Sequence, residues 1–218
     1  MSKRIKKSPM DKTEIRQCGS IHAMKIWEED KIFQSLLLAI KNKTIVDHFR
    51  CFVLYQFAKR FSGLASYAEV GVYKGGTAKL LAKCTKSHVY LFDTFNGMPA
   101  TDPEKDLHKQ FDFNDTSLVA VKAFLNDVEN VSFIEGKFPD SIPKDLPEEF
   151  AFVHIDVDIY QSVKDCCNFF YPKLLVSGVM IFDDYGFNGC PGAKLAVDEY
   201  FGKDVVYLPT GQAMAIKL

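Results

Sequence analysis

The sequence lacks the patterns that mark membrane proteins, secreted proteins and small domains held together by structural zinc. No apolar run approaches the roughly 20 residues that a membrane-spanning helix needs. The first residues are too polar for a signal peptide. The six cysteines form no CxxC pair and no Cys/His spacing typical of zinc. A chain of 218 residues is long enough for a full core and needs no disulfides. We therefore expect a cytoplasmic protein with reduced thiols and no membrane partner.

An excess of charge of one sign is also missing. The formal net charge is −1, so no global field recruits nucleic acid, and we expect no nucleic-acid partner. The P-loop pattern GxxxxGK[ST] is absent, which weighs against an NTPase. The basic run Lys3–Lys7 is predicted to be a solvated, mobile tail.

What the sequence does contain is a regular alternation of strands and helices after Leu64. The predicted strands are residues 66–70, 88–92, 131–134, 150–155, 179–182, 205–208 and 213–218, and the predicted helices are 77–84, 118–128, 162–175 and 193–202. Crossover-length segments between the first five strands predict a doubly wound, Rossmann-like and mostly parallel α/β sheet. Only Pro209–Gln212 joins the last two strands, which is too short for a parallel crossover. The prediction is therefore a seven-stranded sheet whose last strand is antiparallel.

The segment before the sheet has a different pattern. Apolar residues at helical spacing between residues 21 and 61 predict one or two amphipathic helices. We therefore divide the chain into a tail and helical cover, residues 1–62, and a sheet domain, residues 63–218.

Two acidic clusters follow predicted strands in the C-terminal half of the chain. They are HIDVD, residues 154–158, and FDDYG, residues 182–186. The carboxyl ends of parallel strands meet in one crevice, so these carboxylates are predicted to lie together. Close carboxylates repel unless a cation shares them, and oxygen ligands favour a hard ion such as Mg2+. Two members have plainer interpretations: Asp158 as the cap of a helix starting near Tyr160, and His154 as a hydrogen-bonded core histidine.

A glycine loop follows the first predicted strand. In EVGVYKGGTA, residues 69–78, Gly71 and Gly75 permit a tight turn and close approach of a ligand to the backbone. Asp93 lies 22 residues past Gly71, after the next strand, where an acid can bind ribose hydroxyls. The second glycine of the dinucleotide fingerprint is missing. A nicotinamide cofactor, S-adenosylmethionine (SAM) and a plain nucleotide all remain open on these residues alone.

Four motifs together resemble those of the macrocin O-methyltransferase family, from about Tyr67 to the C-terminus. They are LFDTFNGMP (91–99), EGKFPDSIP (135–143), HIDVDIYQS (154–162) and FDDYG (182–186). The resemblance implies a class I methyltransferase that uses SAM and Mg2+ and acts on sugar hydroxyls. It implies a SAM pocket formed by Glu69, Gly71, Tyr73, Gly75, Thr77, Asp93 and Thr94. It implies Asp156, Asp183 and Asp184 as metal ligands, with Asp156 also as the catalytic base.

The sequence departs from the family pattern at two places that concern the acceptor. Val157 stands where the family usually has glycine, and the N-terminal segment is short. The function predicted here is SAM-dependent methylation of a hydroxyl of a sugar or glycoside, with Mg2+ assistance and an aspartate base. The alternatives are a catechol-type small-phenol O-methyltransferase and a non-catalytic SAM-binding module. A nicotinamide reductase is disfavoured by the missing glycine. Residues 96–115 are either a surface excursion or an active-site lid, and self-association is left open.

Overall fold

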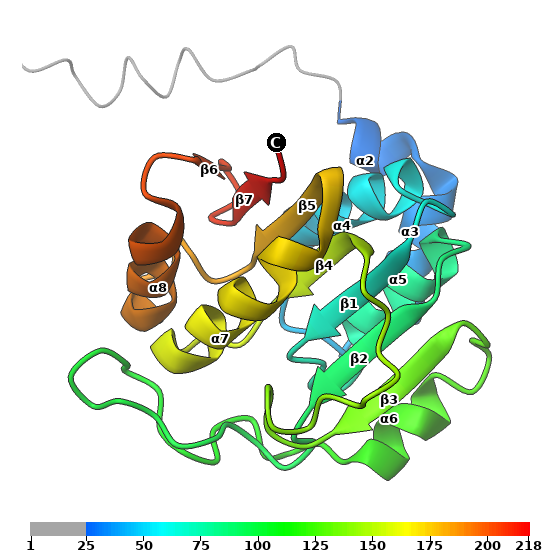
Figure 1. Cartoon of the computed structure of the whole chain (residues 1–218). Coiled ribbons are helices and arrows are strands. Elements are labelled where there is room, and N and C mark those ends of the chain that lie inside the picture. The colour runs from blue at the N-terminus through cyan, green and yellow to red at the C-terminus, as the bar shows by residue number, and fades with distance from the viewer. Residues whose placement is uncertain (1–24) are drawn as a thin grey trace, which may run out of the picture.

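The computed structural model describes residues 25–218, which form an α/β fold (Figure 1). Within the described residues, three helices precede the sheet: α2 (Ile26–Glu29), α3 (Lys31–Ala39) and α4 (His48–Arg60). The strands are β1 (Ser66–Val70), β2 (Val89–Asp93), β3 (Val131–Glu135), β4 (Phe150–Ile155), β5 (Leu174–Phe182), β6 (Val205–Tyr207) and β7 (Ala213–Ile216). The remaining helices are α5 (Gly76–Cys84), α6 (Leu118–Phe124), α7 (Tyr160–Phe170), the 3-10 turn η1 (Tyr171–Lys173) and α8 (Pro191–Phe201). The predicted tail at Lys3–Lys7 lies outside the described residues.

The seven strands form one sheet in the order β3-β2-β1-β4-β5-β7-β6. Strands β1 to β5 pair in parallel, and β7 pairs antiparallel with both β5 and β6. This confirms the predicted doubly wound sheet with an antiparallel last strand. Every residue of the central strand β4 is buried, as expected for a parallel strand covered on both faces.

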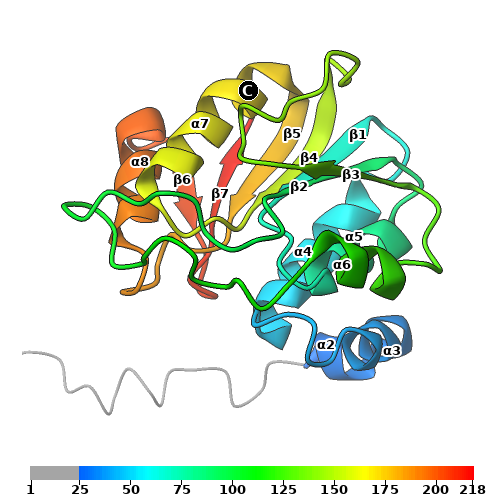
Figure 2. The same ribbon diagram turned by 90° about the horizontal axis from the view of Figure 1, so that it is seen from below.

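Helices cover both faces of the sheet (Figure 2). One face packs against α7 and α8, through a core that includes Val163, Phe170 and Val197. The other face packs against α3, α4, α5 and α6, whose buried side chains include Leu54 and Leu80. Burial of these apolar faces is what fixes the helices on the sheet.

The N-terminal helices share a core with the sheet. Phe33 of α3 and Tyr55 of α4 belong to the same buried cluster as Tyr67 of β1. The hydroxyl of Tyr67 also donates to the carbonyl of Ala58, at 2.8 Å. The helix α4 therefore packs directly on the parallel sheet, and the division of the chain at residue 62 stays a prediction.

The elements differ from the predicted ones mainly at their ends. The helix predicted over 118–128 ends at Phe124, and α7 ends at Phe170, just before Pro172, as expected of proline. The strand β5 begins at Leu174 instead of Val179. Its early part includes exposed Val176 and Ser177, the latter at a φ of 67°, and this break in the apolar pattern hid the strand.

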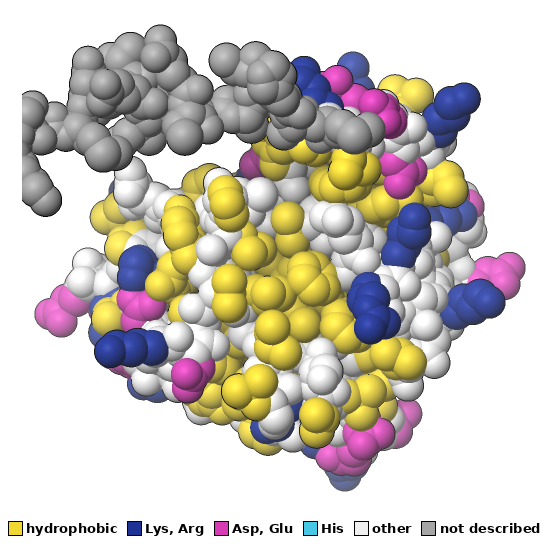
Figure 3. All heavy atoms as spheres, turned by 90° about the horizontal axis from the view of Figure 1, so that it is seen from above, with side chains coloured by type: hydrophobic (Ala, Val, Ile, Leu, Met, Phe, Trp, Pro, Cys, Tyr) yellow, Lys and Arg dark blue, Asp and Glu magenta, His cyan; other side chains and the backbone are white. Residues whose placement is uncertain are grey.

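The amino-terminal edge of the sheet carries exposed apolar side chains, seen from above in Figure 3. Leu64 precedes β1, Val176 lies early in β5, and Leu218 follows β7, and all three are more than half exposed. Self-association, left open by the sequence, stays a prediction. Among residues 25–218, no helix has the length and apolarity to cross a bilayer.

Candidate active site

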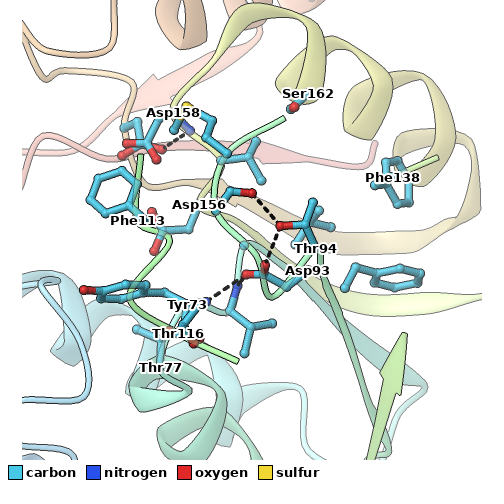
Figure 4. A pocket seen from close by; sticks show the side chains of 18 of the residues that line it. Tyr73, Thr77, Asp93, Thr94, Phe113, Thr116, Phe138, Asp156, Asp158 and Ser162 are labelled. Atoms are coloured by element: carbon cyan, nitrogen blue, oxygen red, sulfur yellow. Dashed lines mark hydrogen bonds between the residues drawn. The ribbon is translucent and has the colours of Figure 1, made fainter. Parts of the chain in front are cut away.

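A cavity lies at the carboxyl edge of the parallel strands (Figure 4). Its free space is about 1010 Å³, including the part open to solvent. Its lining comes from many segments: residues 43–46, Arg50, 70–73, Thr77, 92–94, 97–99, Phe113, Thr116, 136–138, 156–158, Ser162 and Asp184. The sheet thus brings the glycine loop and both acidic clusters to one place, as its topology predicts.

The glycine loop after β1 is shaped by close packing against the loop after β4. A Cβ on Gly71 would lie 1.7 Å from the carbonyl oxygen of Asp156, so no larger residue fits. Gly71 also has a φ of +89°, a conformation that favours glycine. Gly75 has a φ of +85° and is the N-cap of α5. The loop therefore places the first turn of α5 beside the cavity.

Asp93, at the end of β2, holds the glycine loop by its backbone. One carboxylate oxygen accepts from the amides of Val72, at 2.6 Å, and Tyr73, at 2.8 Å. The other accepts from the amide of Phe95, at 2.7 Å. Thr94 donates its hydroxyl to the carbonyl of Gly97, at 2.5 Å. Asp93 therefore organises the backbone on this side of the cavity.

The residues proposed from sequence for the cofactor divide into two groups. Gly71, Tyr73, Thr77, Asp93 and Thr94 line the cavity. Glu69 and Gly75 are not among the lining residues. Glu69 is fully buried and accepts from Nδ1 of His154, at 2.8 Å, which orients its carboxylate toward β4.

The three carboxylates proposed for a metal do converge. Oxygens of Asp156, Asp183 and Asp184 lie within 4.8 Å of one another. The pKa of Asp156 is raised well above its usual value, first because burial disfavours the charged form and then because Asp183 repels it. Burial and the neighbouring carboxylates of Asp158 and Asp156 likewise raise the pKa of Asp184. An oxygen-only set whose members repel one another fits a hard divalent cation.

Asp183 is held by residues that sequence reasoning missed. It pairs with the guanidinium of Arg50 and accepts from the amide of Gln212, at 2.7 Å. Nε2 of His154 lies 3.5 Å from Oδ1 of Asp183, the same oxygen that accepts from Gln212. Burial alone would lower the pKa of His154, but the hydrogen bonds that it donates to Asp183 and Glu69 raise this pKa to about 10. Arg50 and Gln212 carry no local motif, so nothing in the sequence marked them.

The predicted helix cap by Asp158 is wrong. The N-cap of α7 is Ile159, and no side chain at that position caps the helix. The amide of Tyr160 instead donates to Asp106, at 2.8 Å, which arrives from the segment between β2 and α6. The carboxylate of Asp158 turns away, toward the thiol of Cys190, at 3.3 Å. The cap could not be seen in sequence because the acid that provides it lies 54 residues away.

The segment from residue 94 to 117 runs below the carboxyl ends of the strands toward α7 and α8, drawn in green in Figures 1 and 2. It places Met98 and Phe113 in the cavity lining. At one end Asp115 accepts from the hydroxyl of Tyr73, at 2.7 Å, and pairs with Lys74. Asp106 bonds to the start of α7. Of the two alternatives, the segment is therefore more than a surface excursion, because it forms a wall of the cavity.

A second hollow lies beside the end of β5. It is lined by Tyr185, Gly186, Phe187, Asn188, Pro191, Lys194 and Tyr207. The ring of Phe187 faces the guanidinium of Arg50, at 4.6 Å, and Arg50 in turn lines the main cavity. The aromatic hollow is therefore a neighbour of the main cavity.

The comparisons with known proteins assign this chain to a family. The model of the family described as Macrocin-O-methyltransferase (TylF) matches residues 62–210. The chain belongs to the macrocin O-methyltransferase family. The match excludes α2 to α4, although α4 supplies Arg50 to the cavity.

Curated relatives are about 30% identical to this chain over the part that aligns. The demethyldecarbamoylnovobiocin O-methyltransferase of Streptomyces niveus is 32% identical over 152 residues. The 8-demethyl-8-(2,3-dimethoxy-alpha-L-rhamnosyl)-tetracenomycin-C 4'-O-methyltransferase of Streptomyces olivaceus is 30% identical over 154 residues. Each alignment covers 62% of this chain and 57% of the relative, so the chain spans little more than half of their length.

Solved structures agree with the fold of the macrocin O-methyltransferase family. The O-methyltransferase NovP superposes with a TM-score of 0.70 and 26% identity, covering 80% of this chain and 82% of NovP. The calicheamicin methyltransferase CalS11 superposes with a TM-score of 0.62 and 18% identity, covering 90% of this chain and 94% of CalS11. The predicted class I methyltransferase fold is confirmed.

Proposed function

We propose that this protein is a SAM-dependent O-methyltransferase that acts on a hydroxyl of a sugar or glycoside. The observation that carries the proposal is one cavity that contains the glycine loop with Asp93 and the carboxylates of Asp156 and Asp184. Membership of the family supports it, as does the name of the relative that methylates a rhamnosyl-tetracenomycin.

The cofactor side of the cavity is assigned to the glycine loop. SAM supplies a methyl group that is already activated on its sulfonium. Gly71 lets the backbone approach the ligand, and Asp93 and Thr94 lie where ribose hydroxyls bind in this kind of sheet. Met98 and Phe138 offer apolar surface in the same lining. These residues bind and orient the cofactor, and the 94–117 segment keeps water from it.

The metal side is assigned to Asp156, Asp183 and Asp184, whose chemistry fits Mg2+. When bound, Mg2+ would supply Lewis-acid chemistry that favours ionisation of an acceptor hydroxyl. Asp156 is the carboxylate that we assign to accept the acceptor's proton, because Asp183 does not line the cavity and Asp184, which does, already accepts from the amide of Asp158 at 2.9 Å. Arg50 and Gln212 bond to Asp183, so these two residues would orient its carboxylate as a metal ligand.

The acceptor side is assigned to residues outside the glycine loop. Residues 43–46 and Val157 line the cavity. The aromatic hollow lies on the other side of Arg50, whose guanidinium faces the ring of Phe187. Aromatic rings present apolar faces with polar edges, a surface suited to the C–H face of a sugar ring. We assign Phe187 and Tyr207 to the part of a glycoside beyond the methylated hydroxyl.

The test is methyl transfer from labelled SAM in the presence of Mg2+, with glycosides and catechols as separate acceptor panels. Transfer to glycosides supports the proposal. Transfer to catechols alone would replace the acceptor class by a small phenol. SAM binding without transfer to any acceptor would favour a binding module. For Asp→Asn variants of the three site carboxylates, Asp204→Asn is a matched control. Asp204 is exposed and precedes β6, at the opposite edge of the sheet.

A further inference from the structure

A second group of metal-ligand atoms lies beside the proposed Mg2+ site. It consists of Nε2 of His108, Oδ1 of Asp158 and Sγ of Cys190. The three residues come from the 94–117 segment, the loop after β4 and the N-cap of α8. Cys190 is buried and the other two are partly buried, so the group is sheltered from solvent.

The spacing of these atoms matches a tetrahedral ligand set. Sγ of Cys190 lies 3.7 Å from Nε2 of His108 and 3.3 Å from Oδ1 of Asp158, and those two atoms are 3.7 Å apart. Zinc–ligand bonds of about 2.3 Å to sulfur and about 2.0–2.1 Å to nitrogen or oxygen put tetrahedral ligands about 3.3–3.6 Å apart. The triangle is therefore close to the size that Zn2+ requires.

The supporting contacts point the ligand atoms into the triangle. Nδ1 of His108 lies 3.1 Å from Oδ2 of Asp112, which also accepts from the amide of Lys109 at 3.0 Å. With Nδ1 donating to Asp112, Nε2 is left as the lone-pair nitrogen that faces the group. A carboxylate behind a ligating histidine is the usual support of a zinc site.

The backbone of Asp158 is equally constrained. Asp158 has a φ of 59°, which is uncommon outside glycine, and its amide donates to Asp184 at 2.9 Å. These features constrain the backbone of Asp158, whose carboxylate accepts from the thiol of Cys190 at 3.3 Å. A non-glycine residue in this conformation is costly and persists where the surrounding structure enforces it.

We propose that His108, Asp158 and Cys190 bind one Zn2+ ion, separate from the site of Asp156, Asp183 and Asp184. Thiolate, imidazole and carboxylate favour Zn2+, whereas the oxygen-only set favours Mg2+. Binding replaces the proton of the Cys190 thiol, which passes to solvent, and the fourth position is left to water.

The ion would tie the 94–117 segment to the sheet. His108 lies five residues before Phe113, which lines the cavity, and two residues after Asp106, which caps α7. An ion shared by His108, Asp158 and Cys190 would hold this wall of the cavity in place. The role is structural, and it does not depend on methyl transfer.

The test is a metal titration of the metal-free full chain, in buffer with excess Mg2+ to occupy oxygen-only sites. Competition with a chromogenic chelator should give one tight equivalent of Zn2+. Co2+ in place of Zn2+ should give the near-ultraviolet thiolate-to-cobalt absorption band. Amide exchange in residues 96–115 should slow when Zn2+ is bound.

Variants separate this site from its neighbour. Cys190→Ser should abolish the cobalt band, and Asp112→Asn should weaken Zn2+ binding by about 10–100-fold. Cys84→Ser, which alters a thiol at the far end of α5, should bind like the wild type. If Cys190→Ser fails to fold, as judged by circular dichroism, His108→Asn is the substitute. Absence of a cobalt–thiolate band in the wild type would overturn the proposal. So would Zn2+ binding that survives Cys190→Ser and is lost in Asp183→Asn.

Discussion

Arg50, in the N-terminal helix α4, forms an ion pair with Asp183, at the end of β5. The two residues are 133 positions apart, and the Asp183 side chain is fully buried. Arg50 also donates to Asp47, at 2.8 Å. A helix outside the family match therefore neutralises one of the proposed metal ligands.

Replacing Arg50 by methionine should destabilise the protein strongly. The change leaves the buried carboxylate of Asp183 without its cation, which costs about 3–5 kcal/mol in the free energy of unfolding. Urea denaturation in metal-free buffer measures this loss of unfolding free energy. Mg2+ should restore more stability to Arg50→Met than to the wild type. Arg60→Met, at the exposed end of the same helix, is the control. An unfolding free energy equal to the wild type would show that the ion pair does not stabilise the fold.

Replacing Asp93 by alanine should weaken SAM binding. The change leaves the amides of Val72, Tyr73 and Phe95 without their acceptor, and unmet hydrogen bonds of this kind cost about 1–3 kcal/mol. Calorimetry with SAM and S-adenosylhomocysteine measures the loss, and NADH should bind far more weakly to the wild type. Unchanged SAM affinity in this variant would remove Asp93 from the site.

The proposed metal ligands should separate cofactor binding from turnover. Asp183→Asn and Asp184→Asn should lower Mg2+ affinity and leave SAM binding largely intact, because the glycine loop is untouched. Asp156→Asn should reduce turnover most, because it removes both a ligand and the assigned proton acceptor. A chelator should abolish methyl transfer and Mg2+ should restore it. Full activity with excess chelator would refute metal assistance.

Replacing Tyr207 by alanine should raise the KM for glycosides by about tenfold and leave SAM affinity unchanged. The tyrosine is 59% exposed and lines the aromatic hollow, so the change removes acceptor surface with little loss of core. A tenfold change corresponds to about 1.4 kcal/mol of lost contact, which is near the upper end of the usual range for aromatic faces. Steady-state kinetics at saturating SAM give the answer. An unchanged KM would place the acceptor elsewhere.

The stability of the metal-free protein should fall as the pH rises above neutral. The pKa of His154 is raised to about 10 in the fold, whereas an unfolded histidine titrates near its ordinary value of about 6.5. The stabilisation is therefore full below about pH 6.5 and is lost as the pH rises toward 10. Urea midpoints measured from pH 6 to pH 10 test this. In His154→Gln the urea midpoint should change less with pH over the same range. If the variant and the wild type lose stability in parallel, the pH dependence does not come from His154.

The sequence predicted the sheet and the location of the site because both depend on short-range patterns. Short runs rich in apolar residues, such as 150–155, predict buried strands, and parallel strands bring their carboxyl ends together. The glycine loop, Asp93 and the two acidic clusters each follow such a strand. Their convergence therefore needed parallel strands, which the lengths of the connections predict, whereas the structure supplied the strand order.

Contacts between distant segments were decided only by the tertiary structure. The pairing of Arg50 with Asp183 joins residues 133 apart, and the contact of His108 with Cys190 joins residues 82 apart. The capping of Tyr160 by Asp106 overturned a local prediction, because a nearby acid was available in sequence but a distant one was better placed in space. No periodicity encodes such pairs. They depend on how the 94–117 segment and α4 pack on the finished sheet, where burial leaves each charged group only the partners within reach.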